Sequence, residues 1–295
     1  MNPSPHLSPS TLEARLPLVG GILFAAFLAV LATRGYGETT TLLVLSSLLM
    51  FGCCWASAAH LLGARAALRL VLIATSLGWL AEELGADRGW FFGDYDYTDV
   101  LGPRLGAVPV VIPLMWFALS YAGYVIADLI VWQTPSATIP GLPMTALSAL
   151  VGATVVTCYD LGVDPYMVYK LRAWIMERTD GWWFGETVQG FAGWMLVACA
   201  IQLAFRLSLR RWPARPAGPA GARHVLVPLS VYAGLMLFQV CLGYPVEART
   251  IALFAMGFPL LTAGCGLLRW RAANRLAAAA PAPAAAVTPS LKEAA

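Results

Sequence analysis

The sequence has 295 residues, of which 59% are hydrophobic and only 12% are charged, and its mean hydropathy is +0.70. This composition excludes an ordinary soluble domain and indicates a protein that crosses the membrane several times. The formal net charge of +3 is too small and too scattered to indicate binding to nucleic acid. We therefore expect an all-α fold, a polytopic transmembrane helical bundle with re-entrant or interfacial loops.

The chain divides into a transmembrane helical domain, 16–270, between two tails, 1–15 and 271–295. We expect the tails to be disordered because they are rich in Pro, Ser or Ala and lack apolar periodicity. A membrane-spanning helix needs about 20 mostly apolar residues. Eight segments meet this requirement, at 16–33, 40–62, 68–84, 108–132, 140–163, 188–209, 224–243 and 248–268.

The distribution of Lys and Arg predicts the orientation, because cationic side chains near short loops resist translocation. With the N-terminus in the cytoplasm, the inner segments hold twelve of the nineteen Lys and Arg residues. Both termini would then be cytoplasmic, and two acidic loops, 85–107 and 164–187, would face outside. We expect an integral protein of a bacterial cytoplasmic membrane, in contact with membrane lipid.

Residue types that bind metals or redox cofactors are scarce or scattered. The six cysteines lie within apolar segments without a CxxC motif, and the three histidines are far apart. No GxGxxG or Walker motif follows an expected strand. We expect no metal and no cofactor, so any chemistry should depend on carboxyl groups and aromatic side chains.

Six of the sixteen acidic residues fall within 82–99, at and beyond the end of the third span. Glu82 and Glu83 lie at the membrane edge, where a charge costs up to a few kcal/mol unless it is paired or protonated. In one interpretation they pair with Arg88 or Arg104. For Glu82 we favour a functional role, because an ionisable group within a transmembrane segment is by default a candidate for function.

Two further acids close the fifth span. Asp160 and Asp164 stand four residues apart, so on a helix their carboxyl groups share one face. Like charges at such proximity favour protonation of one member, which would supply an acid near neutral pH. In the alternative interpretation, Asp164 ends the helix before Pro165 and Asp160 hydrogen-bonds a neighbouring span. Asp128, on the fourth span, is interpreted as structural.

The stretch 166–178 follows the fifth span and places four apolar residues at helical spacing. These residues are Met167, Leu171, Trp174 and Ile175. The spacing predicts an amphipathic helix that lies in the membrane interface.

Two blocks of the sequence follow the pattern of a known family. The first comprises 82–85 (EELG), 92–103 (FGDYDYTDVLGP) and 108–116 (VPVVIPLMW), and the second comprises 160–165 (DLGVDP), 184–185 (FG) and 191–194 (FAGW). Over roughly residues 40–270, the chain resembles the integral-membrane carotenoid biosynthesis proteins that include the carotenoid 1,2-hydratases. It departs from their pattern at Glu186 and Thr187, where members often have an apolar residue and Pro, and at Gly190, where Asn is expected.

The resemblance implies an enzyme that adds water across the terminal (1,2) double bond of an acyclic carotenoid such as lycopene, without metal or cofactor. Such a reaction requires an acid that protonates the alkene, a base that positions water, and a pocket that tolerates a carbocation. The matching residues are expected to be Asp160 and Asp164 as the acid/base pair, Glu82 as their partner or the alternative acid, and Tyr95, Tyr97, Asp99, Trp116 and Trp194 as the substrate pocket.

Three other functions stay open. A carotenoid end-group cyclase also begins by protonating an alkene, but an internal double bond then captures the cation. A Mg²⁺-dependent prenyltransferase would use Asp160 and Asp164 with Asp94 and Asp96 as metal ligands, although no basic cluster lies near them for a diphosphate. A non-catalytic carotenoid-binding protein would tolerate neutralisation of the acids. The expected partners are a carotenoid taken from the bilayer, membrane lipid and other carotenoid pathway enzymes.

Overall fold

A computed structural model describes residues 11–138, 141–216 and 222–279. In this part of the chain, eight helices are long and apolar enough to cross a membrane, and each overlaps one expected span. They are α1 (Thr11–Arg34), α2 (Thr40–Leu62), α3 (Ala64–Arg88), α4 (Val111–Trp132), α5 (Leu142–Pro165), α6 (Val188–Arg211), α7 (Ala222–Leu242) and α8 (Glu247–Ala279). The expected polytopic helical bundle is confirmed.

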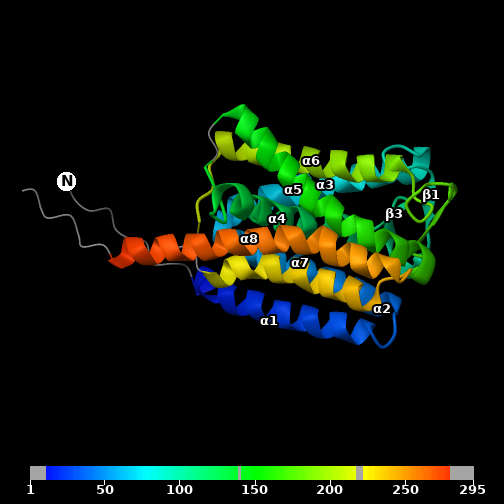
Figure 1. Ribbon diagram of the computed structural model, residues 1–295, viewed down its shortest axis with the longest axis horizontal. Coiled ribbons are helices and arrows are strands. Elements are labelled where there is room, and N and C mark those ends of the chain that lie inside the picture. The colour runs from blue at the N-terminus through cyan, green and yellow to red at the C-terminus, as the bar shows by residue number, and fades with distance from the viewer. Residues whose placement is uncertain (1–10, 139–140, 217–221, 280–295) are drawn as a thin grey trace, which may run out of the picture.

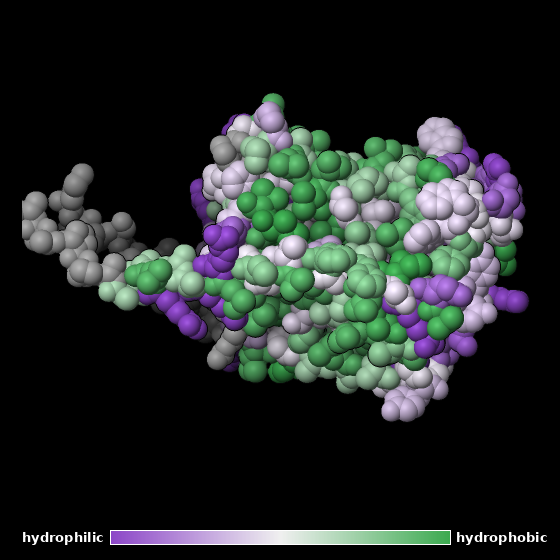
Figure 2. Space-filling model, viewed as in Figure 1, coloured by the Kyte–Doolittle hydropathy of each residue, from purple (hydrophilic) through white to green (hydrophobic). Residues whose placement is uncertain are grey.

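The helices run roughly parallel to one long axis, and α4 lies within the bundle against α2, α3, α5 and α8 (Figure 1). Its large side chains Trp116, Phe117, Tyr121 and Tyr124 are almost completely buried. Figure 2 shows apolar residues along the flank of the bundle and hydrophilic residues gathered toward its two ends. This distribution matches a protein whose flank faces lipid.

The ends of the helical domain differ from the expected tails. Residues 11–15 belong to α1. Residues 271–279 continue α8, because the Ala-rich sequence of this stretch favours helix. The rest of the two predicted tails, 1–10 and 280–295, lies outside the described residues. The chain enters α1 and leaves α8 at the same end of the bundle (Figure 1).

The opposite end carries a cap built from two loops. The α3–α4 loop contains β1 (Tyr95–Tyr97), a 3₁₀ turn (Asp99–Leu101), β2 (Arg104–Leu105) and β3 (Val108–Pro109), and the α5–α6 loop contains β4 (Trp174–Met176). Strands β2 and β3 pair with each other. Strand β1 pairs antiparallel with β4, with Tyr95 opposite Met176 and Tyr97 opposite Trp174. This pairing joins the two acidic loops into one structure over the bundle.

The prediction of an amphipathic helix over 166–178 is wrong. A π-helical turn, Tyr166–Leu171, continues α5, and the chain then becomes strand β4. Arg172 ends the turn with a positive φ of 52°. Backbone pairing with β1, which is remote in sequence, outweighs the local helical periodicity.

Candidate active site

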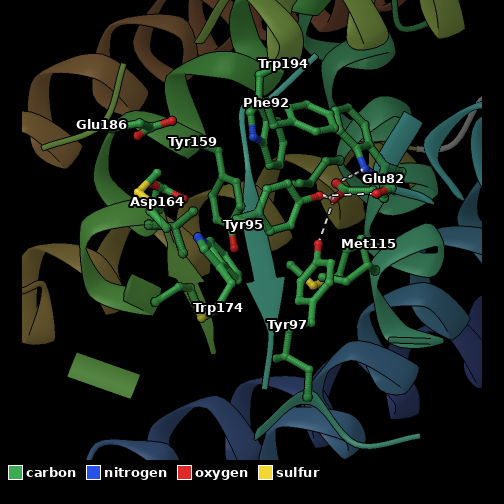
Figure 3. A pocket seen from close by; sticks show the side chains of 17 residues that line it. Glu82, Phe92, Tyr95, Tyr97, Met115, Tyr159, Asp164, Trp174, Glu186 and Trp194 are labelled. Atoms are coloured by element: carbon green, nitrogen blue, oxygen red, sulfur yellow. Dashed lines mark hydrogen bonds between the residues drawn. The ribbon is translucent and has the colours of Figure 1, made fainter. Parts of the chain in front are cut away.

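A cavity of about 60 Å³ lies between the loop cap and the helices (Figure 3). Three carboxylic residues line it: Glu82 from α3, Asp164 from α5 and Glu186 from the α5–α6 loop. In the described part of the chain, no Lys, Arg or His lines this cavity. The remaining lining is aromatic or aliphatic, so the carboxyl groups face an apolar space without a compensating cation.

Glu82 is 5% exposed and accepts three hydrogen bonds. The hydroxyls of Tyr95 and Tyr97 donate to its Oε2 at 2.6 and 2.7 Å, and the indole N–H of Trp116 donates to its Oε1 at 2.9 Å. The two tyrosines reach the same carboxyl because alternate residues of a strand face the same side, and β1 turns Asp96 outward. Three donors on one carboxyl group fit a carboxylate anion.

The two tyrosines that hold Glu82 are themselves buried. Burial and the neighbouring charge of Glu82 raise the pKa of both Tyr95 and Tyr97 well above the usual value. Both hydroxyls therefore keep their protons at neutral pH and act as hydrogen-bond donors.

The other acids of α3 and of the α3–α4 loop do not line the cavity. Arg88 and Arg104 bind Asp87 and Asp99, so the interpretation in which these arginines pair with Glu82 or Glu83 is not what the structure shows. Glu83 accepts a backbone N–H from the β2–β3 turn. Asp99, expected in the substrate pocket, has an exposed side chain that binds Arg104 at 3.0 Å outside the cavity.

Asp160 and Asp164 occupy successive turns of α5. Asp164 is 5% exposed and lines the cavity, whereas Asp160 is fully buried and does not line it. Both carboxyl oxygens of Asp160 lack a hydrogen-bond partner among the described residues, so it is not tied to a neighbouring span there. Asp164 does not terminate the helix, because α5 includes Pro165 and continues into the π-helical turn.

Glu186 is a cavity residue that the sequence did not assign to the site. It follows a tight turn in which Gly181 bridges Gly185, is 4% exposed, and lies beside Asp164 (Figure 3). Burial, together with the negative charges of Asp164 and Asp160, raises the pKa of Glu186 far above its ordinary range. This shift favours the protonated form of the Glu186 carboxyl group.

A signal for Glu186 was present at Gly190. A Cβ at Gly190 would meet the carboxyl group of Glu186. The departures from the family pattern at positions 186 and 190 therefore belong to one structural feature. The missing side chain at 190 provides the room that the carboxyl group at 186 occupies.

Aromatic side chains from both loops and from α4 and α6 surround the cavity. The rings of Trp116 and Trp194 stack with 4.5 Å between centroids, and Phe92 lies 6.4 Å from each. Trp174 lies 6.0 Å from Tyr97, across the β1–β4 pair. Aromatic faces carry partial negative charge and attract cations. The arrangement suits a reaction that develops positive charge on an apolar substrate.

Comparisons with known proteins bear on this chemistry. A family model described as carotenoid biosynthesis protein matches residues 37–261. The chain is also 31% identical over 153 residues to the bisanhydrobacterioruberin hydratase of Haloarcula japonica. That alignment covers 50% of this chain and 48% of the hydratase, so the chain matches about half the length of this curated relative. No solved structure matches the chain.

Proposed function

The chain belongs to the carotenoid biosynthesis protein family, and from this premise we propose that it hydrates the terminal (1,2) double bond of an acyclic carotenoid such as lycopene. The family places the protein in carotenoid modification, and the similarity to a hydratase supports hydration as the reaction. One observation carries the proposal: Asp164 and Glu186 line the same cavity, within a shell of aromatic side chains. Among the described residues, no basic side chain lines this cavity.

The proposed reaction adds one water without redox change. The terminal double bond joins an inner CH carbon to an outer carbon that bears two methyl groups. A proton added to the inner carbon leaves a tertiary carbocation on the outer one. A water oxygen bonds to this carbon and loses a proton to a base, which yields a tertiary alcohol and restores the catalyst.

Asp164 and Glu186 are the proposed acid/base pair. Two neighbouring carboxyl groups without a cation hold a shared proton, because both cannot be ionised together at low cost. In our proposal the protonated member, Glu186, protonates the alkene, and Asp164 receives the proton that water releases. Asp160 does not reach the cavity, so we assign it a positioning role, through its effect on the charge of the neighbouring pair.

Glu82 has a different proposed role. A carboxyl group that already accepts three hydrogen bonds is a poor proton donor. Its negative charge is fixed beside Trp116 and the two tyrosines, where it can stabilise the carbocation together with the aromatic faces.

The size of the cavity agrees with attack at a chain end. About 60 Å³ can hold a branched terminal group but not a long polyene. We propose that the rest of the carotenoid extends into the bilayer and that the substrate arrives from lipid. We further propose cytoplasmic termini in a bacterial cytoplasmic membrane, which places the loop cap on the outer face, and contact with other enzymes of the pathway.

A carotenoid end-group cyclase is the second candidate, because it needs the same acid and the same aromatic shell. The two differ in product mass, since cyclisation adds no water. The prenyltransferase alternative loses support. Asp94 and Asp96 are exposed on the cap while Asp160 and Asp164 are buried, and the described residues contain no group of acids that could hold a metal ion.

The test is expression in a bacterial host that accumulates lycopene, with pigments analysed by liquid chromatography and mass spectrometry. We expect a product heavier by one water, and we expect it to disappear with Asp164→Asn but not with Asp99→Asn, a matched change of an exposed acid. A product of unchanged mass with a shifted absorption spectrum would identify a cyclase. A binding protein would give no product with any variant.

A further inference from the structure

A second cavity, of about 30 Å³, adjoins the candidate active site on the side of α1, α2 and α7. The two cavities share five lining residues: Leu101, Met115, Tyr159, Val163 and Met167. A molecule in the second cavity would therefore lie across this shared wall from the carbocation of the proposed reaction.

The walls of the second cavity include polar side chains in an otherwise apolar interior. Ser46 and Ser47 of α2, Gln239 of α7 and Arg34 at the end of α1 all face it, and all are buried. The two serine hydroxyls donate to the carbonyl oxygen of Leu43 at 2.9 and 3.0 Å. Ser46 Oγ already accepts a hydrogen bond from the guanidinium of Arg34 at 3.3 Å. A hydroxyl oxygen has two acceptor sites, so each serine can accept one further hydrogen bond.

Gln239 points to the occupant of this cavity. Its amide nitrogen donates to the carbonyl oxygen of Tyr159 at 3.4 Å, but its Oε1 has no partner among the described residues although it is buried. A buried amide oxygen without a donor costs about 1–3 kcal/mol, and ordered water commonly satisfies such groups. A cavity needs only about 10–15 Å³ to hold one water. The polar lining and the volume therefore fit water and not a polyene.

A third and larger cavity adjoins the second one toward the end of the bundle. It lies between the α1–α2 and α7–α8 loops, has a volume of about 730 Å³, and is lined by charged residues that include Lys170 and Arg249. It shares Arg34, Leu43 and Tyr166 with the second cavity. The three cavities thus form a series from the charged end of the protein to the carboxyl pair.

One hydrogen-bonded group lies between the third cavity, which is the outer one, and the second cavity, which is the middle one. Glu38 binds Arg34 at 2.9 Å and accepts the hydroxyl of Tyr166 at 2.8 Å. The guanidinium of Arg34 also stacks on Phe238, 4.7 Å from the ring centroid. These contacts close the middle cavity toward the aqueous end.

We propose that the cavity lined by Ser46, Ser47 and Gln239 is the binding site and access route of the water that the carbocation captures, with Arg34, Glu38 and Tyr166 as its outer closure. This inference rests on the proposed hydration. The substrate arrives from lipid, so the water must reach the cation from another side. A narrow site delivers single waters to the cation without opening the aromatic shell to bulk solvent.

The first test is X-ray hydroxyl-radical footprinting of the wild-type protein in detergent, which labels side chains that contact ordered water. Met50 lines the middle cavity and is 2% exposed, and Met256 of α8 is fully buried and lies away from it. We expect Met50 to be oxidised at least about tenfold faster than Met256. Burial alone would protect both side chains equally, because both are almost completely buried. Equal protection of both methionines would overturn the proposal whatever the reaction is.

The second test is Gln239→Leu, which keeps the size of the side chain and removes the amide. We expect slower formation of the alcohol by about tenfold or more, with unchanged KM for the carotenoid. Gln202→Leu is the matched control, because Gln202 is a buried glutamine on α6 that does not line these cavities. If the wild type makes alcohol and Gln239→Leu makes it equally fast, the water site is wrong. A wild type that makes none would instead refute the proposed function.

Discussion

One buried acid, Asp128, and one buried pair of acids, Asp164 and Glu186, lie at opposite ends of the bundle and differ in whether a basic residue accompanies them. Asp128, near the end of α4, is fully buried, binds Arg206 at 2.7 Å and accepts the backbone N–H of Ala137 at 2.9 Å. Asp164 and Glu186, under the loop cap, have no basic residue among the described side chains of their cavity. The first acid ties α4 to α6. No basic side chain in the cavity stabilises the ionised form of Asp164 and Glu186, so this pair is the candidate for proton transfer.

The largest expected effect is on turnover at the cap. Asp164→Asn and Glu186→Gln each remove one member of the proposed acid/base pair, and we expect kcat to fall by about 10²–10⁴-fold. Asp160→Asn should reduce it less, because Asp160 does not contact the cavity. The measurement is alcohol formation by purified protein in lipid nanodiscs. Full turnover by both pair variants would refute the assignment.

The next effect is on stability at the opposite end. Asp128→Asn leaves Arg206 buried without its counter-ion, and loss of one partner from a buried pair costs about 3–5 kcal/mol. We expect a lower Tm in detergent but an unchanged kcat for the protein that stays folded. Asp99→Asn, which removes an exposed partner of Arg104, provides the control and should leave Tm almost unchanged. A kcat loss without a Tm change in Asp128→Asn would contradict the comparison.

The donors to Glu82 should have an intermediate effect. Tyr95→Phe or Tyr97→Phe keeps the ring and removes one hydrogen bond to a charged acceptor, worth about 1.5–3 kcal/mol. We expect kcat to fall by about tenfold for each variant, because the carboxylate loses its orientation and not its charge. Glu82→Gln should have a larger effect than either variant. If the tyrosine variants lose more activity than Glu82→Gln, the tyrosines and not Glu82 carry the function.

The smallest expected effect is a pH dependence of stability. The pKa of Glu186 is raised in the folded protein by burial and by Asp164 and Asp160. The folded state therefore holds a proton that the unfolded state releases near pH 4.3, so this contribution to stability falls as pH rises from that value toward the raised pKa. We expect Glu186→Gln to have a flatter decline of Tm between neutral and alkaline pH than the wild type. Parallel Tm curves would show that Glu186 is not protonated in the folded state.

Part of the site is predictable from the sequence. Glu82 stands out because a carboxyl group near the end of an apolar helix is by default a candidate for function. Tyr95, Tyr97 and Trp116 were expected only from the resemblance to the family, since no strand was predicted at 95–97. In the structure, the side chains of Tyr95, Tyr97 and Trp116 all donate hydrogen bonds to the carboxyl group of Glu82.

The remaining features depend on contacts between segments remote in sequence. Glu186 comes close to Asp164 only because the α5–α6 loop folds over α5, and β4 exists only because it pairs with β1. Local periodicity therefore gave the wrong structure for 166–178. Asp99 fits the sequence pattern but points outward, since Arg104 lies within reach on the exposed face of the loop.

In the proposed reaction, the carboxyl pair protonates the terminal alkene and water then completes the addition. The most direct measurement incubates purified protein with lycopene in deuterium oxide enriched in the heavy oxygen isotope, followed by mass spectrometry of the product. We predict one non-exchangeable deuterium on carbon and one heavy oxygen in each hydrated end group, and neither with Asp164→Asn. A product with carbon-bound deuterium but no oxygen would show cyclisation, and a product without carbon-bound deuterium would contradict protonation of the alkene.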